Sequence, residues 1–415
     1  MNEKVLALDG GTPVRNKPMG YQCVGGNVVG KEEMELVQEV LEHRTLFRHY
    51  GPNTPHMVDD FEHEAGEFLK KKYVLATSTG SGSFFCAASA LEWGPGDEVI
   101  IPTYGWITSY SSVALTGAVP VFAEIDESLC MSPEAFEKKI TPRTKAVMVI
   151  HYQGGVGRLE EICRIAGNHG IAVVEDSAQT WVEGKDDDGL HNRGIVSCFS
   201  LQAHKMITAG DGGVFATDDQ RLFERAVRFH DLGLLRDTFA SRLASPVMTR
   251  PFCGMQWRMG ELSGAAALAQ MRKLPDLIQR CRTNWQFLRD ELADNFPGLK
   301  FRAVRPEDDA GILLAFDLKS RENTEYFARA LKAEGLVYGP TSYCQTMDRI
   351  EVIRCCLEDA RRYRPEEFTA TEELVQRYAK LAVMPVYTAD DMKDIAEGTK
   401  KVLHVMQDRS MIDLS

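Results

Sequence analysis

Short apolar runs alternate with amphipathic stretches from about residue 30 to residue 220. Most of these runs are apolar on both faces, which is typical of strands in a mostly parallel sheet that helices cover on each side. The predicted strands are 73–77, 98–102, 119–125, 145–152, 171–176, 195–201 and 212–217. The helices predicted between them are 31–43, 57–71, 83–93, 133–140 and 158–169. The pattern therefore predicts the α/β class for this part of the chain.

The pattern changes after about residue 260. It predicts a long helix over 261–295, a strand over 311–318, a helix over 323–334, a strand near 336–339 and a last helix after Thr388. Thr388 with Asp391 three residues later resembles a capping box. We therefore expect an N-terminal arm over 1–30, a large domain over 31–270 with a helix-covered central sheet, and a smaller C-terminal α/β domain over 271–415.

The composition indicates which classes of binding partner are not expected. The 415 residues are 44% hydrophobic and 26% charged, with a formal net charge of −12. An acidic chain lacks the basic surface that nucleic acids and anionic membranes attract, so neither is expected as a partner. The ten cysteines are scattered and no CxxC or HExxH spacing occurs, which predicts reduced cysteines and no metal site. Without a signal peptide or an apolar span, the chain is expected to be cytoplasmic.

Two segments that could bind a ligand follow predicted strands in the first half of the chain. STGSGS (78–83) stands between a strand and an apolar helix. Its small residues allow close approach of a ligand, and the helix start favours a phosphate. PTYGWITS (102–109) places Trp106 where it could support a flat ring. Taken alone, each segment is more often an ordinary turn or a core residue.

Two further segments carry a carboxylate and a lysine. Asp176 in VVEDSAQ (173–179) ends a buried strand, at the edge where ligands bind in such sheets. A buried carboxylate needs a partner, and a protonated pyridine nitrogen would serve, although a helix cap would too. Lys205 follows the strand that ends near Ser200. A lysine in a loop is usually a surface charge, and it becomes a nucleophile only where its pKa is lowered.

The order of these features is more informative than any one of them. It runs phosphate cradle, ring platform, carboxylate, serine and lysine, which is the order of a pyridoxal phosphate site in fold type I enzymes. The chain also resembles the DegT/DnrJ/EryC1/StrS family of aminotransferases over nearly its whole length. The segments that carry the resemblance include LALDGGTPVR (6–15), YVLATSTGSGSF (73–84), IAVVEDSAQ (171–179), FSLQAHKMITAGDGGVFATDD (199–219), WRMGELSGAAALAQMRKL (257–274) and MPVYTADDM (384–392).

The resemblance implies a role for each matching position. Lys205 would form the Schiff base with pyridoxal phosphate and shuttle the proton, and Asp176 would pair the pyridinium nitrogen. Trp106 would stack on the ring, and Gln179 would lie near the phenolic oxygen. The phosphate would be held by Gly80, Ser81 and Ser200. The family also implies a homodimer whose sites lie at the subunit interface.

Two positions depart from the family pattern. Gln256 stands where an asparagine usually reaches the partner's phosphate across the dimer; either its longer side chain keeps that contact, or the loop is placed differently here. The usual Gly-Thr of the cradle is Gly80-Ser81, which keeps the hydroxyl. The opening segment and the lysine segment are closer to the branch of cyclitol aminotransferases and aminohydroxybenzoate synthases.

The resemblance also places the walls of the acceptor pocket in loops around 46–52, 181–194 and 338–350. Their candidate residues are Arg48, His49, Tyr50, Lys185, His191 and Arg193. Each could bind an acceptor, but most are expected to be solvated surface residues.

The expected reaction is a ping-pong transamination from L-glutamate or L-glutamine to a ketone on a sugar-like or cyclitol acceptor. A dehydratase or aromatising lyase of the same family is the alternative. In the dehydratases a histidine replaces the lysine, and His204 adjoins Lys205, but the spacing to Ser200 favours Lys205. A non-catalytic sensor or partner subunit on the same fold is a further alternative, which the presence of Lys205 disfavours.

Overall fold

The computed structural model describes residues 5–20, 22–51, 53, 56–183, 194–246, 251–339, 345–360 and 365–414. A seven-stranded sheet forms the centre of the larger part, in the order β1-β7-β6-β5-β4-β2-β3. Only β7 runs antiparallel to its neighbours. The strands are β1 Tyr73–Thr77, β2 Glu98–Pro102, β3 Val119–Ala123, β4 Thr144–Ile150, β5 Ala172–Asp176, β6 Val196–Ser200 and β7 Gly213–Thr217. The predicted strands are thus confirmed, with small shifts at their ends.

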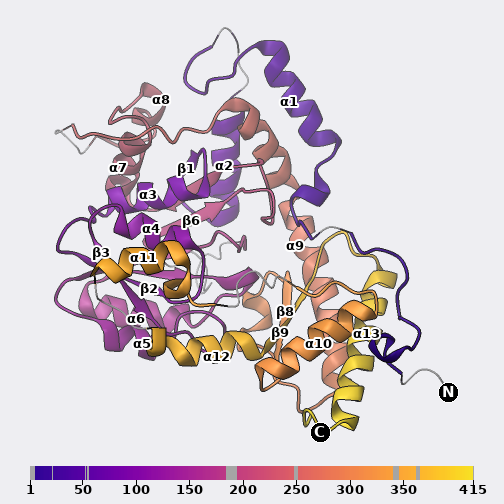
Figure 1. Ribbon diagram of the computed structural model, residues 1–415. Helices are drawn as coiled ribbons and strands as arrows, with labels where there is room; N and C mark the ends of the chain where they lie inside the picture. The colour runs from indigo at the N-terminus through magenta and orange to yellow at the C-terminus, as the bar shows by residue number, and fades with distance from the viewer. Residues whose placement is uncertain are drawn as a thin grey trace.

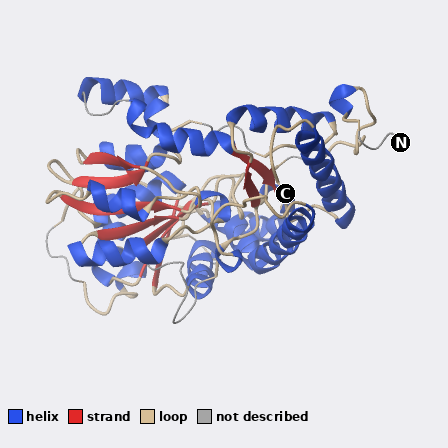
Figure 2. Cartoon of the chain, turned by 90° about the horizontal axis from the view of Figure 1, so that it is seen from below, coloured by secondary structure: helices blue, strands red, loops and turns tan. Residues whose placement is uncertain are grey.

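Helices cover both faces of this sheet, as Figure 2 shows with strands between helices. Side chains that alternate along a strand point to opposite faces. In β1, Tyr73 and Leu75 pack in the cluster that contains α3 and α7, whereas Val74 and Ala76 pack toward α2 and α9. The helices of this part are α1 Lys31–His43, α2 Met57–Leu69, α3 Gly80–Ala90, α4 Ile107–Ala114, α5 Pro133–Lys139, α6 Leu159–His169, α7 Gln220–His230 and α8 Asp237–Ala240.

The helix α9, Glu261–Asn295, links the two parts of the chain (Figure 1). Its 35 residues include Pro275, and they span roughly 50 Å at 1.5 Å per residue. It packs against α1 and α2 near its start and against α13 farther along. The predicted domain limit at 270/271 falls inside this helix and stays a prediction.

The smaller part contains a two-stranded antiparallel sheet, β8 Leu313–Asp317 and β9 Tyr378–Ala382. The strand predicted near 336–339 is wrong, because β8 pairs with β9 and residues 336–339 form no strand. The predicted capping box of the last helix is confirmed, since the Thr388 and Asp391 side chains each bond the other's backbone N–H. The helices here are α10 Arg321–Ala333, α12 Thr369–Arg377 and α13 Ala389–Asp408. The helix α11, Glu351–Ala360, lies instead against the larger part near α4, where Ile353 joins the core (Figure 1).

The N-terminal arm lies along the smaller part and then reaches the larger one (Figure 1). The buried Glu334 carboxylate accepts hydrogen bonds from the backbone N–H of Ala7 at 2.8 Å and of Val14 at 3.0 Å. Farther along the arm, Gly25 N–H donates to the carbonyl of Lys205 at 2.7 Å. The arm therefore connects the smaller part of the chain to the turn that carries the predicted lysine.

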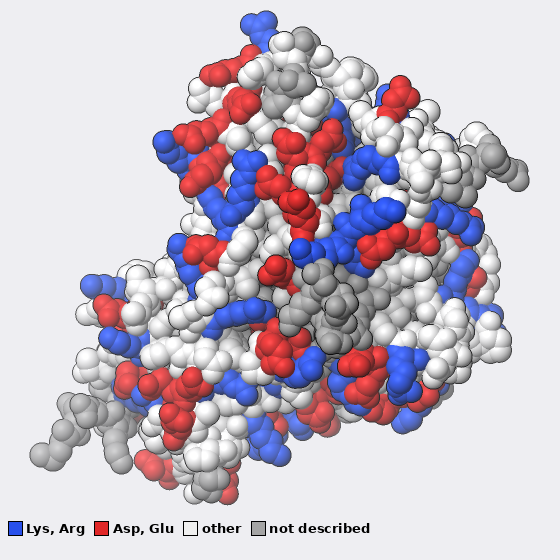
Figure 3. Space-filling view, turned by 180° about the vertical axis from the view of Figure 1, so that it is seen from behind, with Lys and Arg blue, Asp and Glu red and all other residues white. Residues whose placement is uncertain are grey.

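The surface mixes charges of both signs. Figure 3 shows one face on which Lys and Arg side chains are interspersed with Asp and Glu. Among the described residues, no helix is long and apolar enough to cross a membrane.

Candidate active site

A cavity of about 780 Å³ lies at the carboxyl ends of the central strands. The ends of β4, β5 and β6 contribute Ile150, Asp176 and Ser200 to its wall, and Ile312 and Ala382 come from the smaller part of the chain. This is the edge at which doubly wound sheets bind ligands. Seven of the eight predicted site residues line this one cavity: Gly80, Ser81, Trp106, Asp176, Gln179, Ser200 and Lys205.

The start of α3 forms one end of the cavity. Thr79 caps the helix, and its hydroxyl accepts a hydrogen bond from Gly82 N–H at 2.9 Å. A Cβ on Gly80 would lie 2.9 Å from the Cβ of Ser200, so only glycine allows this approach of helix to strand. The Ser81 and Thr108 hydroxyls lie 3.2 Å apart at the same end. N–H groups of a first helical turn and hydroxyls such as those of Ser81 and Thr108 are groups that can bind a phosphate.

Asp176 is the last residue of β5 and is buried. Its Oδ2 accepts a hydrogen bond from the Ser109 hydroxyl at 2.8 Å, and its Oδ1 accepts one from Ala178 N–H at 3.1 Å. Burial raises the pKa of Asp176, while these hydrogen bonds and the charge of Lys205 oppose the rise. A cation in the cavity would offset the desolvation of this carboxylate.

Lys205 lies in a turn beyond β6, in which its N–H donates to the carbonyl of Gln202 at 2.8 Å. Its side chain lines the cavity with Asp176. Burial lowers the pKa of Lys205, and the negative charge of Asp176 opposes this effect. A lysine held in this state is neutral more often than a surface lysine and is a better nucleophile and base.

Trp106 and Gln179 both line the cavity, Trp106 with an exposed aromatic side chain and Gln179 with a hydrogen-bonded amide. Trp106 stands just before α4, is 50% exposed and lines the cavity. The Gln179 side chain is fixed, because its Oε1 accepts a hydrogen bond from the backbone N–H of Gln153 at 2.9 Å.

Gln256 does not line this cavity. It is exposed and forms an isolated backbone bridge with Asp231. The next residue, Trp257, does line the cavity, and its carbonyl accepts from Ser78 N–H at 2.6 Å. The contact of Gln256 with a partner's phosphate stays a prediction.

Several cavity residues had no assigned role in the sequence. Thr108 lines the cavity and Ser109 donates to Asp176 behind it. Both stand in PTYGWITS (102–109), where their spacing after Trp106 is the only signal that could have identified them. Gln22 enters the cavity from the arm, and Gln153 enters from the loop after β4. No sequence pattern marks either glutamine.

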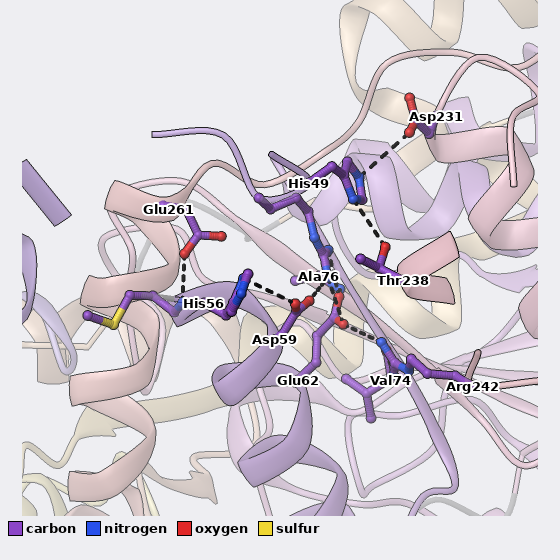
Figure 4. Close-up of polar contacts among 12 residues, drawn as sticks. His49, His56, Asp59, Glu62, Val74, Ala76, Asp231, Thr238, Arg242 and Glu261 are labelled. Carbon is purple, nitrogen blue, oxygen red and sulfur yellow. Dashed lines mark hydrogen bonds and ion pairs between the residues drawn. The ribbon is translucent and has the colours of Figure 1, made fainter. Parts of the chain in front are cut away.

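Side chains of the loop 46–52 are expected to be solvated, but Figure 4 shows His49 directed toward Asp231. The Arg48 guanidinium is buried and pairs with Glu62 at 2.8 Å and with Asp59 at 2.6 Å. The His49 side chain is buried next to Asp231, and burial lowers the pKa of His49 to about 4. The surface expectation is therefore wrong for Arg48 and His49, because acidic side chains of the following helix α2 pair with Arg48, and Asp231 from a distant segment lies against His49.

Tyr50, in contrast, is 71% exposed. The other candidates for the acceptor pocket, Lys185, His191 and Arg193, lie outside the described residues, as does part of the loop 338–350.

Comparisons with known proteins agree with this architecture. A model described as the DegT/DnrJ/EryC1/StrS aminotransferase family matches residues 27–400. The aminotransferase TlmJ from Streptoalloteichus hindustanus has a TM-score of 0.78 at 23% identity, covering 94% of this chain and 100% of that chain. The structure of 3-amino-5-hydroxybenzoic acid synthase has a TM-score of 0.77 at 22% sequence identity, and the match covers 94% of this chain and 100% of that chain. The dehydratase ColD, with bound GDP-perosamine, has a TM-score of 0.76 at 20% sequence identity, and the match covers 92% of this chain and 100% of that chain. Similarities at these identities show a shared fold.

Proposed function

The chain belongs to the DegT/DnrJ/EryC1/StrS aminotransferase family, and we propose that it moves an amino group from L-glutamate or L-glutamine to a ketone on a sugar-like or cyclitol acceptor. It is a pyridoxal-phosphate-dependent aminotransferase with the fold type I architecture. The observation that carries the proposal is that Lys205 and Asp176 line one cavity whose other end is the start of α3.

The residues present fit pyridoxal phosphate. The cradle formed by Gly80, Ser81 and Ser200 suits the phosphate, and it would be filled by a Cβ at Gly80. The buried carboxylate of Asp176 suits a protonated ring nitrogen, because that cation offsets its desolvation. Lys205 lines the same cavity, with its pKa lowered by burial, as a nucleophile toward an aldehyde requires.

The bound cofactor supplies the ring that accepts electrons from the donor's α-carbon and holds the amine between the two half-reactions. In the proposed mechanism, Lys205 Nζ would remove the α-proton of the amino donor and deliver a proton to C4′ of the cofactor. Asp176 would hold the proton on the ring nitrogen, and Trp106 would cover one face of the ring. Gln179 would contact the phenolic oxygen, and in the second half-reaction Lys205 would move the proton in the reverse direction, toward the carbon of the ketone acceptor.

The chemistry of the cavity supports a hydroxylated acceptor. Beyond the residues assigned to the cofactor, its wall carries Gln22, Gln153, Gln202, His204 and Asp211. Amide, imidazole and carboxylate groups can bind several hydroxyls of one ring. The related DesI structure, which carries a TDP-sugar product, and the synthase of an aminobenzoate are consistent with a ring acceptor.

Substitution of Lys205 by alanine tests the assignment of the catalytic base. The variant should lose multiple-turnover transamination and the yellow absorbance that an amino donor discharges. Donor loss should be followed with cyclitol ketones, keto-sugar nucleotides and aminoshikimate-type precursors as acceptors. Multiple-turnover transamination by the variant would contradict the role of Lys205.

Dehydration is the second candidate, because ColD is a dehydratase with the same fold. His204 is exposed and contacts Gln202, with Nδ1 3.1 Å from its Nε2, whereas Lys205 is the residue that interacts with Asp176. This arrangement supports the lysine as the reacting group. Transamination consumes the amino donor in proportion to product, and dehydration does not.

We also propose a cytoplasmic homodimer with the sites near the subunit interface. Large apolar side chains are exposed on segments next to the cavity wall, namely Leu46, Leu232 and Met255. These segments adjoin one another, because Leu232 N–H donates to Met255 O and Glu261 N–H donates to Leu46 O, each at 3.1 Å. Exposed apolar surface of this kind favours association. Sedimentation should give a particle of two 46.4 kDa chains, and a monomer would contradict the proposal.

A further inference from the structure

The loop after β4 holds a residue in an uncommon backbone conformation. Gln153, in the short helical turn Tyr152–Gly154, has φ 45° and ψ 54°. Residues other than glycine rarely adopt this left-handed region and keep it only where their surroundings impose it. The Gln153 side chain also lines the active-site cavity. The groups that impose this conformation therefore affect the cavity wall.

An arginine of the small domain holds this loop. The Arg302 guanidinium donates to the carbonyl of Tyr152 at 2.9 Å and to the carbonyl of Gln153 at 3.1 Å. It also pairs with the Asp309 carboxylate at 2.5 Å. Both charged side chains are buried, so the guanidinium has little freedom to leave this position.

The loop in turn fixes the amide of Gln179. The backbone N–H of Gln153 donates to Gln179 Oε1 at 2.9 Å. Because a backbone N–H can only donate, the amide oxygen of Gln179 must face the loop. The amide nitrogen Nε2, which can only donate, is then the polar atom on the other side of the amide group. Gln179 lines the cavity, so the group that it can offer a ligand is a hydrogen-bond donor.

We propose that Arg302 is a positioning residue, which through Gln153 sets Gln179 to donate a hydrogen bond to an oxygen of the bound cofactor. This inference rests on the proposed placement of Gln179 beside the phenolic oxygen. A donated hydrogen bond stabilises negative charge on that oxygen and weakens its hold on the proton of the Lys205 imine. The small domain would thus set the pH at which this proton leaves.

The test is a pH titration of the visible absorbance of the holoenzyme without substrates. Gln179→Leu removes the donor, and Arg302→Lys keeps the charge opposite Asp309 but loses the fork that holds two carbonyls. Both variants should raise the titration midpoint, by about one unit, as expected when one hydrogen bond to a charged group is lost. The double variant should show no further shift.

Gly155→Ala provides a second route to the same displacement. A Cβ on Gly155 would lie 2.9 Å from Arg302 Cζ, so the guanidinium must move while both charges stay. Its midpoint should also rise. Arg305→Lys is the matched control, because Arg305 pairs with Asp308 in the same segment but contacts neither loop carbonyl. It should leave the midpoint unchanged.

The titration separates this inference from the proposed function. An unchanged midpoint in Arg302→Lys and Gly155→Ala, or an additive shift in the double variant, would refute the role of Arg302. An unchanged midpoint in Gln179→Leu would refute the donor role of Gln179. In either case, yellow absorbance that the amino donor still discharges would leave the transamination intact. Absence of that absorbance in the wild-type holoenzyme would contradict the proposed function itself.

Discussion

Replacing Glu62 by glutamine should destabilise the protein strongly, because this carboxylate joins three segments of the large domain (Figure 4). It accepts hydrogen bonds from Arg48 at 2.8 and 3.0 Å, from Arg242 at 2.6 Å and from the backbone N–H of Ala76 at 2.7 Å. A glutamine has only one oxygen, so its NH₂ group would face an arginine donor.

The magnitude follows from the titration of the same group. Burial alone would raise the pKa of Glu62, but the charges of Arg48 and Arg242 outweigh it and hold this pKa at about 2. The difference from an unfolded value of 4.5 corresponds to about 3 kcal/mol. Because the folded-state pKa is the lower one, this stability is complete above pH 4.5 and is lost as the pH falls toward 2.

Urea unfolding of the holoenzyme, followed by far-ultraviolet circular dichroism, measures this effect. Glu62→Gln should lower the free energy of unfolding by about 3 kcal/mol at pH 7, and by roughly half as much at pH 3. Glu64→Gln is the matched control on the same helix, since Glu64 pairs with the exposed Arg272 and should lose at most about 1 kcal/mol. Equal losses in the two variants, or a loss for Glu62→Gln that does not shrink in acid, would refute the reasoning.

Three further changes have defined outcomes. Gly80→Ala should raise the dissociation constant of pyridoxal phosphate about tenfold or more, because the new Cβ would lie 2.9 Å from the Cβ of Ser200. Equilibrium dialysis measures this constant, and an unchanged value would contradict the proposed binding of the phosphate at this helix start. Ser109→Ala should weaken cofactor binding by about tenfold, the size of one hydrogen bond to a charged group, since Asp176 loses a donor at 2.8 Å; the same dialysis measures it, and equal affinity would show that this bond is unimportant. Burial raises the pKa of Glu261 to about 7. The wild type should therefore lose stability relative to Glu261→Gln as pH rises from about 4.5 to about 7. Melting temperatures of both proteins at pH 5 and pH 8 measure this, and an equal difference between the two proteins at both pH values would contradict it.

The central sheet could be predicted because its strands carry their own signal. Runs such as 73–77 and 98–102 are apolar except at one end, where Thr77 and Glu98 stand, and the structure buries all five residues of each. The strand β9 was missed because Lys380 interrupts its apolar run. That lysine is buried, with its Nζ donating to the Tyr104 hydroxyl at 3.0 Å. A contact between residues so distant in the chain leaves no local pattern.

Only the main residues of the cavity wall could be predicted from the sequence. Asp176 and Ser200 end apolar strands, and Gly80 starts a helix after one, so their place at the sheet edge could be predicted. The partners that adjust them could not. Ser109 reaches Asp176 from a different strand–helix unit, and Arg302, from the smaller part of the chain, donates to the carbonyl of Tyr152 in the loop beside the cavity.

The sequence by itself determined the chain order of the strands in the central sheet, the position of the lysine turn and the helix start that follows the first strand. These depend on local rules, namely alternation of side chains along strands, helix capping and the small size of glycine. Only the tertiary structure decided which charged residues are buried. Arg48 and His49 look like surface residues in their own segment, yet Glu62 and Asp231 enclose them. The reason is physical, because a charge can be buried only where the folded chain brings a partner to it.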